Sequence, residues 1–467
     1  MSAQVKERGR IGVLGWTLLF LLAGLMPGWA VSVEYVVKQI GDENYFNRDP
    51  VISETGFAAW TAYVSAEGEE SASEIHLYEN GQSRPLTRGN VPGGTTHYRP
   101  CVYSNFVAWI GSFPSPKIGE DNWTLREVPD AERDTPYEEL AAFPVSIPEE
   151  QKPEEGATNG TPEEAAAGPQ AKGAPGPTGS GDLGTAAARR GPSGVMEACV
   201  WFGDEIKRLS WDWRNDFGIS LWGRTAAWQK SKGWPFGWEI MVWNDGEMYQ
   251  LTTNFYYDMA PQVQGNQVVW YGWDGNDYEI FLHDRVAGIT LQVTSNRYDD
   301  VAPVVWDGVV AWEAYPGADA EIFLWQDGRF QRLSDNPWDD TNPRIWNGKV
   351  VWQGFDGDDF EIYYFNGEKT VKLTSNRHDD VNPDIRDGFI CWMAYYDNWD
   401  SEIFAWDIDA GDYVTLIDEQ GRAGSTPGRL SYNEVEDREP RTAGRRVIWQ
   451  VQQEGKSLIQ LAEPRQK

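Results

Sequence analysis

The stretch from Val293 to Glu313 reads VTSNRYDDVAPVVWDGVVAWE, and residues 320–334 continue it as AEIFLWQDGRFQRLS. The same plan returns as LSDNPWDDTNPRIWNGKVVW from Leu333 and as LTSNRHDDVNPDIRDGFICW from Leu373. Runs rich in Val, Ile, Phe, Tyr and Trp are typical of strands, and the Asp-Gly and Asn-Gly pairs between them accept the positive φ of tight β-turns. Each copy therefore predicts four strands joined by hairpins.

A four-stranded unit that repeats about every 40 residues without a helical pattern is typical of a propeller blade. The copies can be counted from one tryptophan in the second strand of each, which we expect in the core. These residues are Trp60, Trp109, Trp228, Trp270, Trp312, Trp352, Trp392 and Trp449. We therefore predict an all-β fold, a single β-propeller of eight four-stranded blades, with seven blades as the alternative.

The ends of the chain suggest how the propeller closes, because an unpaired edge strand invites aggregation. The last copy has strands at residues 446–451 and 457–462 but stops before a fourth strand. Residues 33–40 precede the first proline of the repeat, Pro50, and belong to no blade of their own. We expect this N-terminal strand to complete the eighth blade.

The composition is strongly acidic, with 72 Asp and Glu against 40 Lys and Arg and a formal net charge of −32. Such a charge repels nucleic acid and favours cations or basic protein surfaces. We therefore expect no nucleic-acid partner.

The N-terminus has the pattern of a signal peptide. Lys6, Arg8 and Arg10 precede the apolar run at residues 11–26, and Ala30 offers a cleavage site. The alternative is an uncleaved membrane anchor, although the run is short for a bilayer span. We predict a signal peptide at residues 1–30 and a periplasmic or secreted propeller at 31–467, with no stable membrane span after cleavage.

A low-complexity insertion interrupts the second blade at residues 112–196. It is rich in Pro, Gly, Ala and Glu, a composition that cannot bury enough apolar surface to offset its ordering entropy. It separates the second strand of that blade from the third, so it should emerge on the face that carries the links between blades. A tether, a lid and a spacer all fit.

An aspartate stands three residues before the proline position of six copies, and Asn47 and His97 replace it in the other two. Because the first strand of each blade lines the central channel, we expect an acidic ring at one opening, stabilised by a cation or a basic partner. Alternatively, each aspartate caps its own loop as in an Asx turn. The predicted partner-binding residues are Asp216, Asp258, Asp300, Asp340, Asp380 and Asp437, with Trp273, Trp338 and Trp399 near them.

A second acidic set follows the spacing D-x-x-D-x-E between the second and third strands, with a third copy at Asp397. Such spacing gathers the carboxylate oxygens that calcium prefers, although it does not match an EF-hand loop. The alternative is a polar turn followed by a glutamate that starts a strand and bonds to a neighbouring loop. The predicted calcium ligands are Asp274, Asp277, Glu279, Asp356, Asp359 and Glu361.

Signals for catalysis are poor. The four histidines fall at different repeat positions and form no ligand set, and no G-x-S-x-G elbow occurs. We expect a non-catalytic protein. The alternative is a carbohydrate-active enzyme, a glycoside hydrolase or lyase, that works at the acidic face. A single deep pocket holding His97 beside close carboxylates would favour this alternative.

The repeat D-x-x-P, then Asp-Gly or Asn-Gly, a Trp strand, E-I-[FY] and a closing L-T or L-S resembles the TolB-like (PD40) propeller repeat. The match is plain in the four copies from Asp258 to Leu416. The resemblance implies a propeller that binds other macromolecules in an export compartment. TolB itself has six blades and a separate α/β domain, neither of which this chain shows. We therefore expect a scaffold whose acidic face binds a basic protein, a carbohydrate or a cation-bridged ligand.

Overall fold

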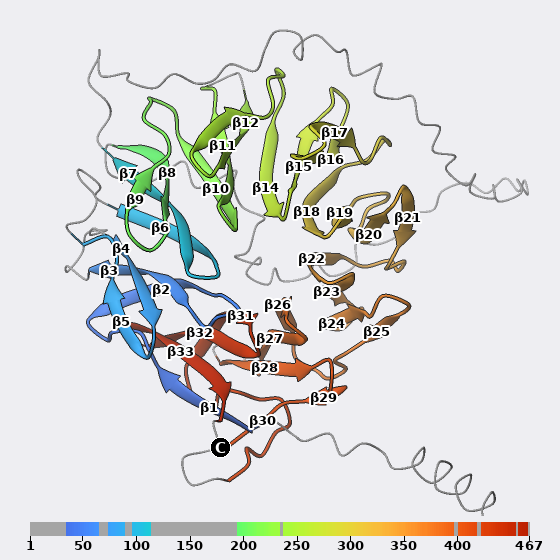
Figure 1. Cartoon of the computed structure of the whole chain (residues 1–467). Helices are drawn as coiled ribbons and strands as arrows, with labels where there is room; N and C mark the ends of the chain where they lie inside the picture. Colours follow the sequence, from blue (N-terminus) through green and yellow to red (C-terminus); the bar gives the residue numbers. More distant parts are fainter. Residues whose placement is uncertain are drawn as a thin grey trace, which may run out of the picture.

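The computed structural model describes residues 34–64, 73–88, 96–113, 194–233, 237–396, 400–417, 422–453 and 456–465. All of its elements are β-strands, so the all-β prediction is confirmed. Within these ranges no helix has the length and apolarity that crossing a bilayer requires. The predicted signal peptide and nearly all of the predicted insertion lie outside the described residues. The sheets stand around a common axis, which is the architecture of a β-propeller (Figure 1).

Six sheets have four strands each, and each strand pairs antiparallel with the next one in the chain. The first three sheets are β6 (Thr96–Tyr103), β7 (Phe106–Phe113), β8 (Val195–Trp201) and β9 (Ile206–Arg208); β10 (Asp216–Trp222), β11 (Thr225–Ser231), β12 (Trp238–Asn244) and β13 (Glu247–Gln250); and β14 (Asp258–Gln264), β15 (Gln267–Trp273), β16 (Tyr278–Asp284) and β17 (Ile289–Gln292). The other three are β18 (Asp300–Trp306), β19 (Val309–Ala314), β20 (Glu321–Gln326) and β21 (Arg329–Arg332); β22 (Asp340–Trp346), β23 (Lys349–Phe355), β24 (Phe360–Phe365) and β25 (Thr370–Lys372); and β26 (Asp380–Arg386), β27 (Phe389–Tyr395), β28 (Ser401–Asp407) and β29 (Asp412–Tyr413).

The seventh sheet has nine strands and joins the two ends of the chain. β1 pairs antiparallel with β33 and parallel with β30. β33 meets β2 at one parallel pair, Phe46 with Ser457. Its strands are β1 (Glu34–Gln39), β2 (Tyr45–Ile52), β3 (Ala58–Val64), β4 (Ser73–Glu79), β5 (Gln82–Pro85), β30 (Thr415–Leu416), β31 (Glu436–Ala443), β32 (Arg446–Gln453) and β33 (Lys456–Pro464).

The inner strands converge on the axis. The guanidinium of Arg386 at the end of β26 lies 5.4 Å from the ring of Trp222 on β10 and 5.9 Å from the ring of Trp306 on β18. The two tryptophan rings meet edge to face with centroids 5.4 Å apart. These three strands belong to sheets that are not neighbours, so their ends can meet only near a shared axis.

The repeated tryptophans form the core between sheets. All eight are at most 1% exposed, as predicted. Trp352 of β23, for example, packs in one cluster with Ala311 and Leu324 of the preceding sheet. Aromatic side chains of this size supply a large share of the apolar area that a core buries. The tryptophan therefore joins each sheet to its neighbour.

The residue before the repeat proline, or before Ile219 where that proline is replaced, adopts a left-handed conformation, with φ between 47° and 60°. The first two strands of every sheet shift register there. L-residues rarely adopt this region, and here it forms a β-bulge. The neighbouring sheet accepts the freed N–H in several cases: Ala260 donates to Gln229, and Asn382 to Gln353, each at 2.8 Å. The residues are Asp49, Arg99, Gly218, Ala260, Ala302, Asn342, Asn382 and Glu439.

Candidate functional site

The six aspartates predicted to form an acidic ring are buried at the start of the inner strands. Each is at most 2% exposed: Asp216, Asp258, Asp300, Asp340, Asp380 and Asp437. Side chains in the interior cannot present an acidic ring to a partner. The predicted ring is therefore wrong, and the alternative of a local structural role fits the bonds that these carboxylates make.

Five of the aspartates accept a hydrogen bond from the indole N–H of the tryptophan twelve residues later, at 2.7–3.1 Å. The same five accept a second bond from the side-chain amide of an asparagine four residues earlier. Asn47 and His97 take the aspartate's place in the two N-terminal copies and accept the indole N–H of Trp60 and Trp109 at 2.8 and 3.0 Å. In these five blades the carboxylate thus connects the preceding link to the second strand of the blade.

Asp216 is the exception. It accepts the hydroxyl of Ser210 and the backbone N–H of Ala198, and the indole nitrogen of Trp228 has no partner in the described structure. The residue four positions earlier is Asp212 instead of asparagine. This blade keeps the buried tryptophan but lacks its polar bond.

Burial raises the pKa of most of these aspartates because it disfavours the charged carboxylate. The pKa of Asp300 rises to about 6, and the pKa values of Asp216, Asp340, Asp380 and Asp437 rise to about 7. The indole and amide donors lower the pKa again but by less than burial raises it. Near neutral pH these groups are therefore only partly ionised.

A second set of carboxylates lies near the start of the third strand in seven blades: Glu74, Glu197, Glu239, Glu279, Glu321, Glu361 and Glu402. Several accept the backbone N–H of the asparagine that opens the next link. Asn296 donates to Glu279 at 2.7 Å, and Asn376 donates to Glu361 at 3.0 Å. The predicted bond to a neighbouring loop is confirmed.

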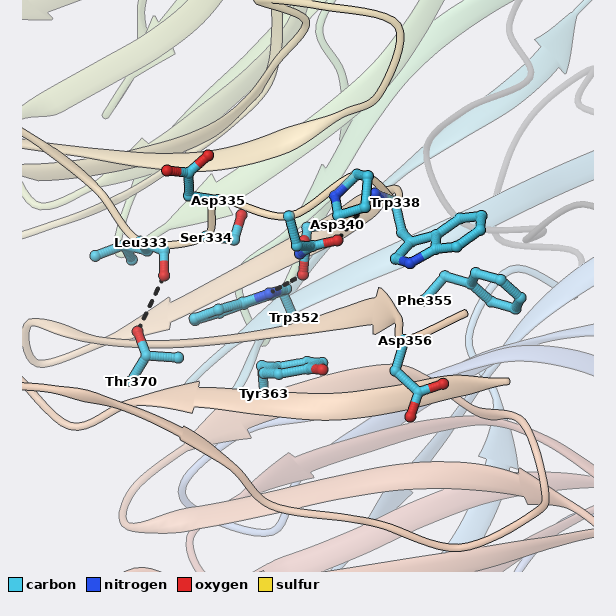
Figure 2. Close-up of a pocket in the computed structure, with 12 residues that line it drawn as sticks. Leu333, Ser334, Asp335, Trp338, Asp340, Trp352, Phe355, Asp356, Tyr363 and Thr370 are labelled. Carbon is cyan, nitrogen blue, oxygen red and sulfur yellow. Dashed lines mark hydrogen bonds between the residues drawn. The ribbon is translucent and has the colours of Figure 1, made fainter. Parts of the chain in front are cut away.

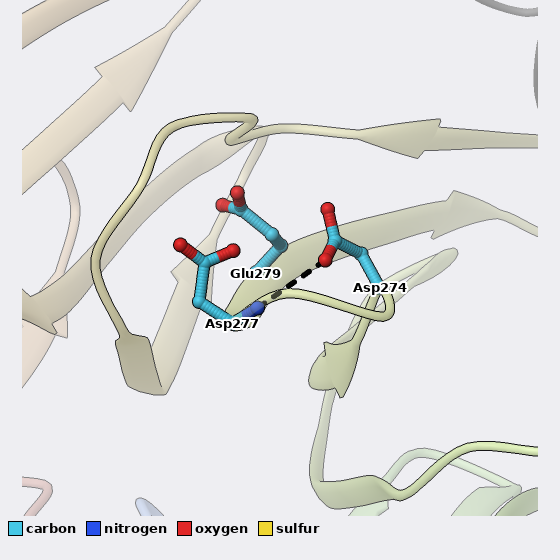
Figure 3. A group of neighbouring side chains, drawn as sticks. All are labelled: Asp274, Asp277 and Glu279. Carbon is cyan, nitrogen blue, oxygen red and sulfur yellow. Dashed lines mark hydrogen bonds between the residues drawn. The ribbon is translucent and has the colours of Figure 1, made fainter.

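The loops with D-x-x-D-x-E spacing bring their carboxylates together (Figure 3). Asp274, Asp277 and Glu279 each contribute one carboxylate oxygen, and these three oxygens lie within 4.8 Å of one another. Asp356, Asp359 and Glu361 form a matching group. Asp274 and Asp356 each accept backbone N–H bonds from their own loop, as in Asx turns. The third copy begins at Asp397, outside the described residues.

The links between blades and the loops between second and third strands share one face of the propeller, here called the link face. Eight of the nine exposed aromatic side chains in the described residues lie there, and the sequence analysis identified only part of this set. They are Trp211, Trp213, Phe255, Tyr256, Tyr257, Tyr315, Trp338 and Tyr432. Exposed carboxylates stand among them: Asp274, Asp299, Asp335, Asp339, Asp356 and Asp358.

Of the three tryptophans predicted at the site, Trp338 is 43% exposed on the link face. It lines an open pocket of about 440 Å³ together with Asp335, Asp356 and Phe355, and Asp340 borders the same pocket (Figure 2). Trp273 is half-buried and meets Tyr278 edge to face at 5.2 Å. Trp399 lies outside the described residues.

His97 does not form the site that would indicate an enzyme. Burial lowers the pKa of its ring to about 4. Its Nδ1 accepts the indole N–H of Trp109, and its backbone bonds to Ser73, so the described bonds of His97 include no carboxylate.

No protein-family model and no curated protein matches this sequence. Among solved structures, the β-propeller domain of the Trilobed protease from Pyrococcus furiosus is 12% identical with a TM-score of 0.44, over 84% of this chain and 99% of that one. A putative TolB from Agrobacterium tumefaciens is 12% identical with a TM-score of 0.34, over 44% and 82%. The Pyrococcus horikoshii acylaminoacyl peptidase is 11% identical with a TM-score of 0.38, over 75% and 57%. None of these similarities assigns an activity to this chain.

The aspartate–indole bond predicts a difference between two otherwise similar substitutions. Trp352→Phe removes a donor from the buried Asp340, whereas Trp228→Phe removes an N–H that has no partner among the described residues. Both lose similar apolar volume, so Trp352→Phe should lower the free energy of unfolding by about 1–3 kcal/mol more than Trp228→Phe. Urea unfolding of the two variants tests this, and equal losses would contradict the stabilising role of the bond.

The raised pKa values predict that stability falls as the pH rises. Between about pH 4 and 8 the folded chain holds protons that the unfolded chain releases, so the free energy of unfolding decreases across this window and levels off above it. Melting temperatures should therefore be higher at pH 5 than at pH 7.5. Asp340→Asn should flatten this slope, while Asp327→Asn, on an exposed turn, should not. A melting temperature that rises from pH 5 to pH 7.5 would refute the prediction.

Proposed function

We propose that the protein is an exported, non-catalytic binding protein built as one eight-bladed TolB-like propeller. The inner strands contact one another in the cyclic order β2, β6, β10, β14, β18, β22, β26, β31 and back to β2. Because β2 and β33 share a single residue pair, the nine-stranded sheet divides into β2–β5 and a blade of β31, β32, β33 and β1. In this reading the N-terminal strand closes the propeller. Export rests on the basic residues before the apolar run at 11–26.

The partner we propose is a basic segment of another protein, bound on the link face. The observation that carries this proposal is the mixture of exposed aromatic rings and carboxylates on that face. A Lys or Arg side chain can place its charge over an aromatic ring and beside a carboxylate at once, and cation–π contacts contribute about 0.5–2 kcal/mol. The net charge of −32 would also speed the approach of such a segment.

The pocket beside Trp338 is the proposed anchor point. The indole of Trp338 and the ring of Phe355 meet edge to face with centroids 5.4 Å apart, and Asp335 and Asp356 lie along the same pocket. The side chain of Asp335 is 81% exposed and pairs with Arg332 at 2.8 Å. Asp356 pairs with Lys372 at 2.6 Å, so a bound Lys or Arg would share these carboxylates with the chain's own cations or displace them. A pocket of about 440 Å³ is large enough to hold a single long side chain.

A deca-arginine peptide tests the proposal, with deca-glutamate as the charge control. Trp338→Ala should weaken binding of deca-arginine about 2- to 30-fold, as expected from the loss of one cation–π contact. Phe330→Ala is the matched control, because Phe330 is equally exposed at 43% but lies outside the link face. Calorimetric titration at low and high salt measures both.

Two outcomes would refute this proposal. One is equal binding of the two peptides, and the other is equal weakening by Trp338→Ala and Phe330→Ala. Release of reducing ends from a polysaccharide panel would support the carbohydrate-active alternative instead, since the same exposed rings can also stack on sugars.

A further inference from the structure

The glutamates near the start of the third strand, six of them buried, have a recurring partner. In six of the seven blades that carry one, a Lys or Arg side chain forms an ion pair with it. The pairs are Glu74–Arg88, Glu197–Arg208, Glu239–Lys232, Glu321–Arg332, Glu361–Lys372 and Glu402–Arg429. A buried carboxylate is costly unless a positive charge balances it, so this repetition reflects a recurring electrostatic requirement.

In four of these blades the cation comes from one position. It pairs across the strands with the residue two positions after the glutamate: Cys199 with Arg208, Phe323 with Arg332, Tyr363 with Lys372, and Phe404 with Arg429. In the blade of β14–β17 the same position, opposite Phe281, holds Gln292. Glutamine carries no charge, so this blade lacks the cation that the others supply.

Glu279 is therefore the exception among the seven. No Lys or Arg contacts it within the described part of the chain, its side chain is fully buried, and its Oε2 has no hydrogen-bond partner. Asp277 stands beside it, 6% exposed, and neither of its carboxylate oxygens has a hydrogen-bond partner among the described residues. Asp274 completes the group, and all three point toward one another (Figure 3). Within the described residues no Lys or Arg balances this group, and burial raises the pKa of Glu279 to about 8 and raises the pKa of Asp277 as well.

The blade of β22–β25 shows what occupies the same place elsewhere. There Lys372 places its Nζ 2.6 Å from Asp356 and 3.3 Å from Glu361. The ammonium group thus lies within the second carboxylate group, which corresponds residue by residue to Asp274, Asp277 and Glu279. A bound cation in the first group would take the position that Lys372 fills in the second.

We propose that Asp274, Asp277 and Glu279 bind one divalent calcium ion, and that Lys372 replaces such an ion in the related group. The donors are carboxylate oxygens, which hard cations prefer, and three carboxylates can supply up to six ligand atoms, close to the six to eight that calcium takes. The site does not depend on the partner proposed above.

The test is calorimetric titration of the chelator-treated full chain with calcium chloride, paired with thermal melts. The wild type should show one saturable site and a higher melting temperature with calcium, because an ion that binds only the folded state stabilises it. Asp277→Asn should weaken binding at least about tenfold, as loss of one charged ligand from a small oxygen site would. Asp358→Asn, an exposed residue of the related loop, is the control and should leave binding unchanged.

Two exchanges between the blades make the test specific. Gln292→Lys should abolish calcium binding. In chelator this variant should have a melting temperature no lower than that of the wild type, because the new ammonium group takes the place of the ion. Lys372→Gln should create a second calcium site. Absence of binding at about 5 mM calcium, above the range of weak sites, would overturn the proposal. Binding that survives both Asp277→Asn and Gln292→Lys, or that favours magnesium, would also overturn it.

Discussion

The structure depends on a buried carboxylate that accepts the indole N–H of a buried tryptophan. The aspartate opens the innermost strand and the tryptophan sits on the second strand, so their bond fixes where the link from one blade enters the next. Both groups would be costly to bury alone, since an unpaired polar group in the interior loses its hydration. Paired, they orient each sheet at the axis, while the same tryptophan packs against the preceding sheet.

Much of the fold could be predicted from the sequence because the features that determine it recur in successive copies of the repeat. The Asp-Gly turns, the spacing of residues such as Trp312 and Trp352, and the absence of helical periodicity all indicate stacked four-stranded sheets. The orientation of the aspartates could not be predicted, because a repeated position does not say whether its side chain faces the channel or the sheet interior. The left-handed residue before each proline was also missed, since alanine at positions 260 and 302 gives no sign of positive φ.

The candidate sites appear where one copy departs from the others. The ion pair between the repeated glutamate and a Lys or Arg is a structural requirement of most blades. The blade that lacks it is therefore the place where we expect a bound ion. The signal was present in the sequence: Arg or Lys precedes the closing Leu-Ser or Leu-Thr at Arg332 and Lys372, whereas Gln292 precedes Val-Thr. The link face follows the same logic, because residues such as Tyr256 and Trp338 occupy a position whose backbone is fixed by the repeat and whose side chain is free to vary.

The most direct test is a pH titration of the aspartate carboxyl groups, monitored by carbon-13 NMR of protein labelled at the aspartate side chains. If the repeated carboxylates are interior partners of the tryptophans, the resonances of Asp340, Asp380 and Asp437 should titrate at about pH 7. Titration of all three near the ordinary aspartate value of about 4 would mean that they face water, and would contradict the account.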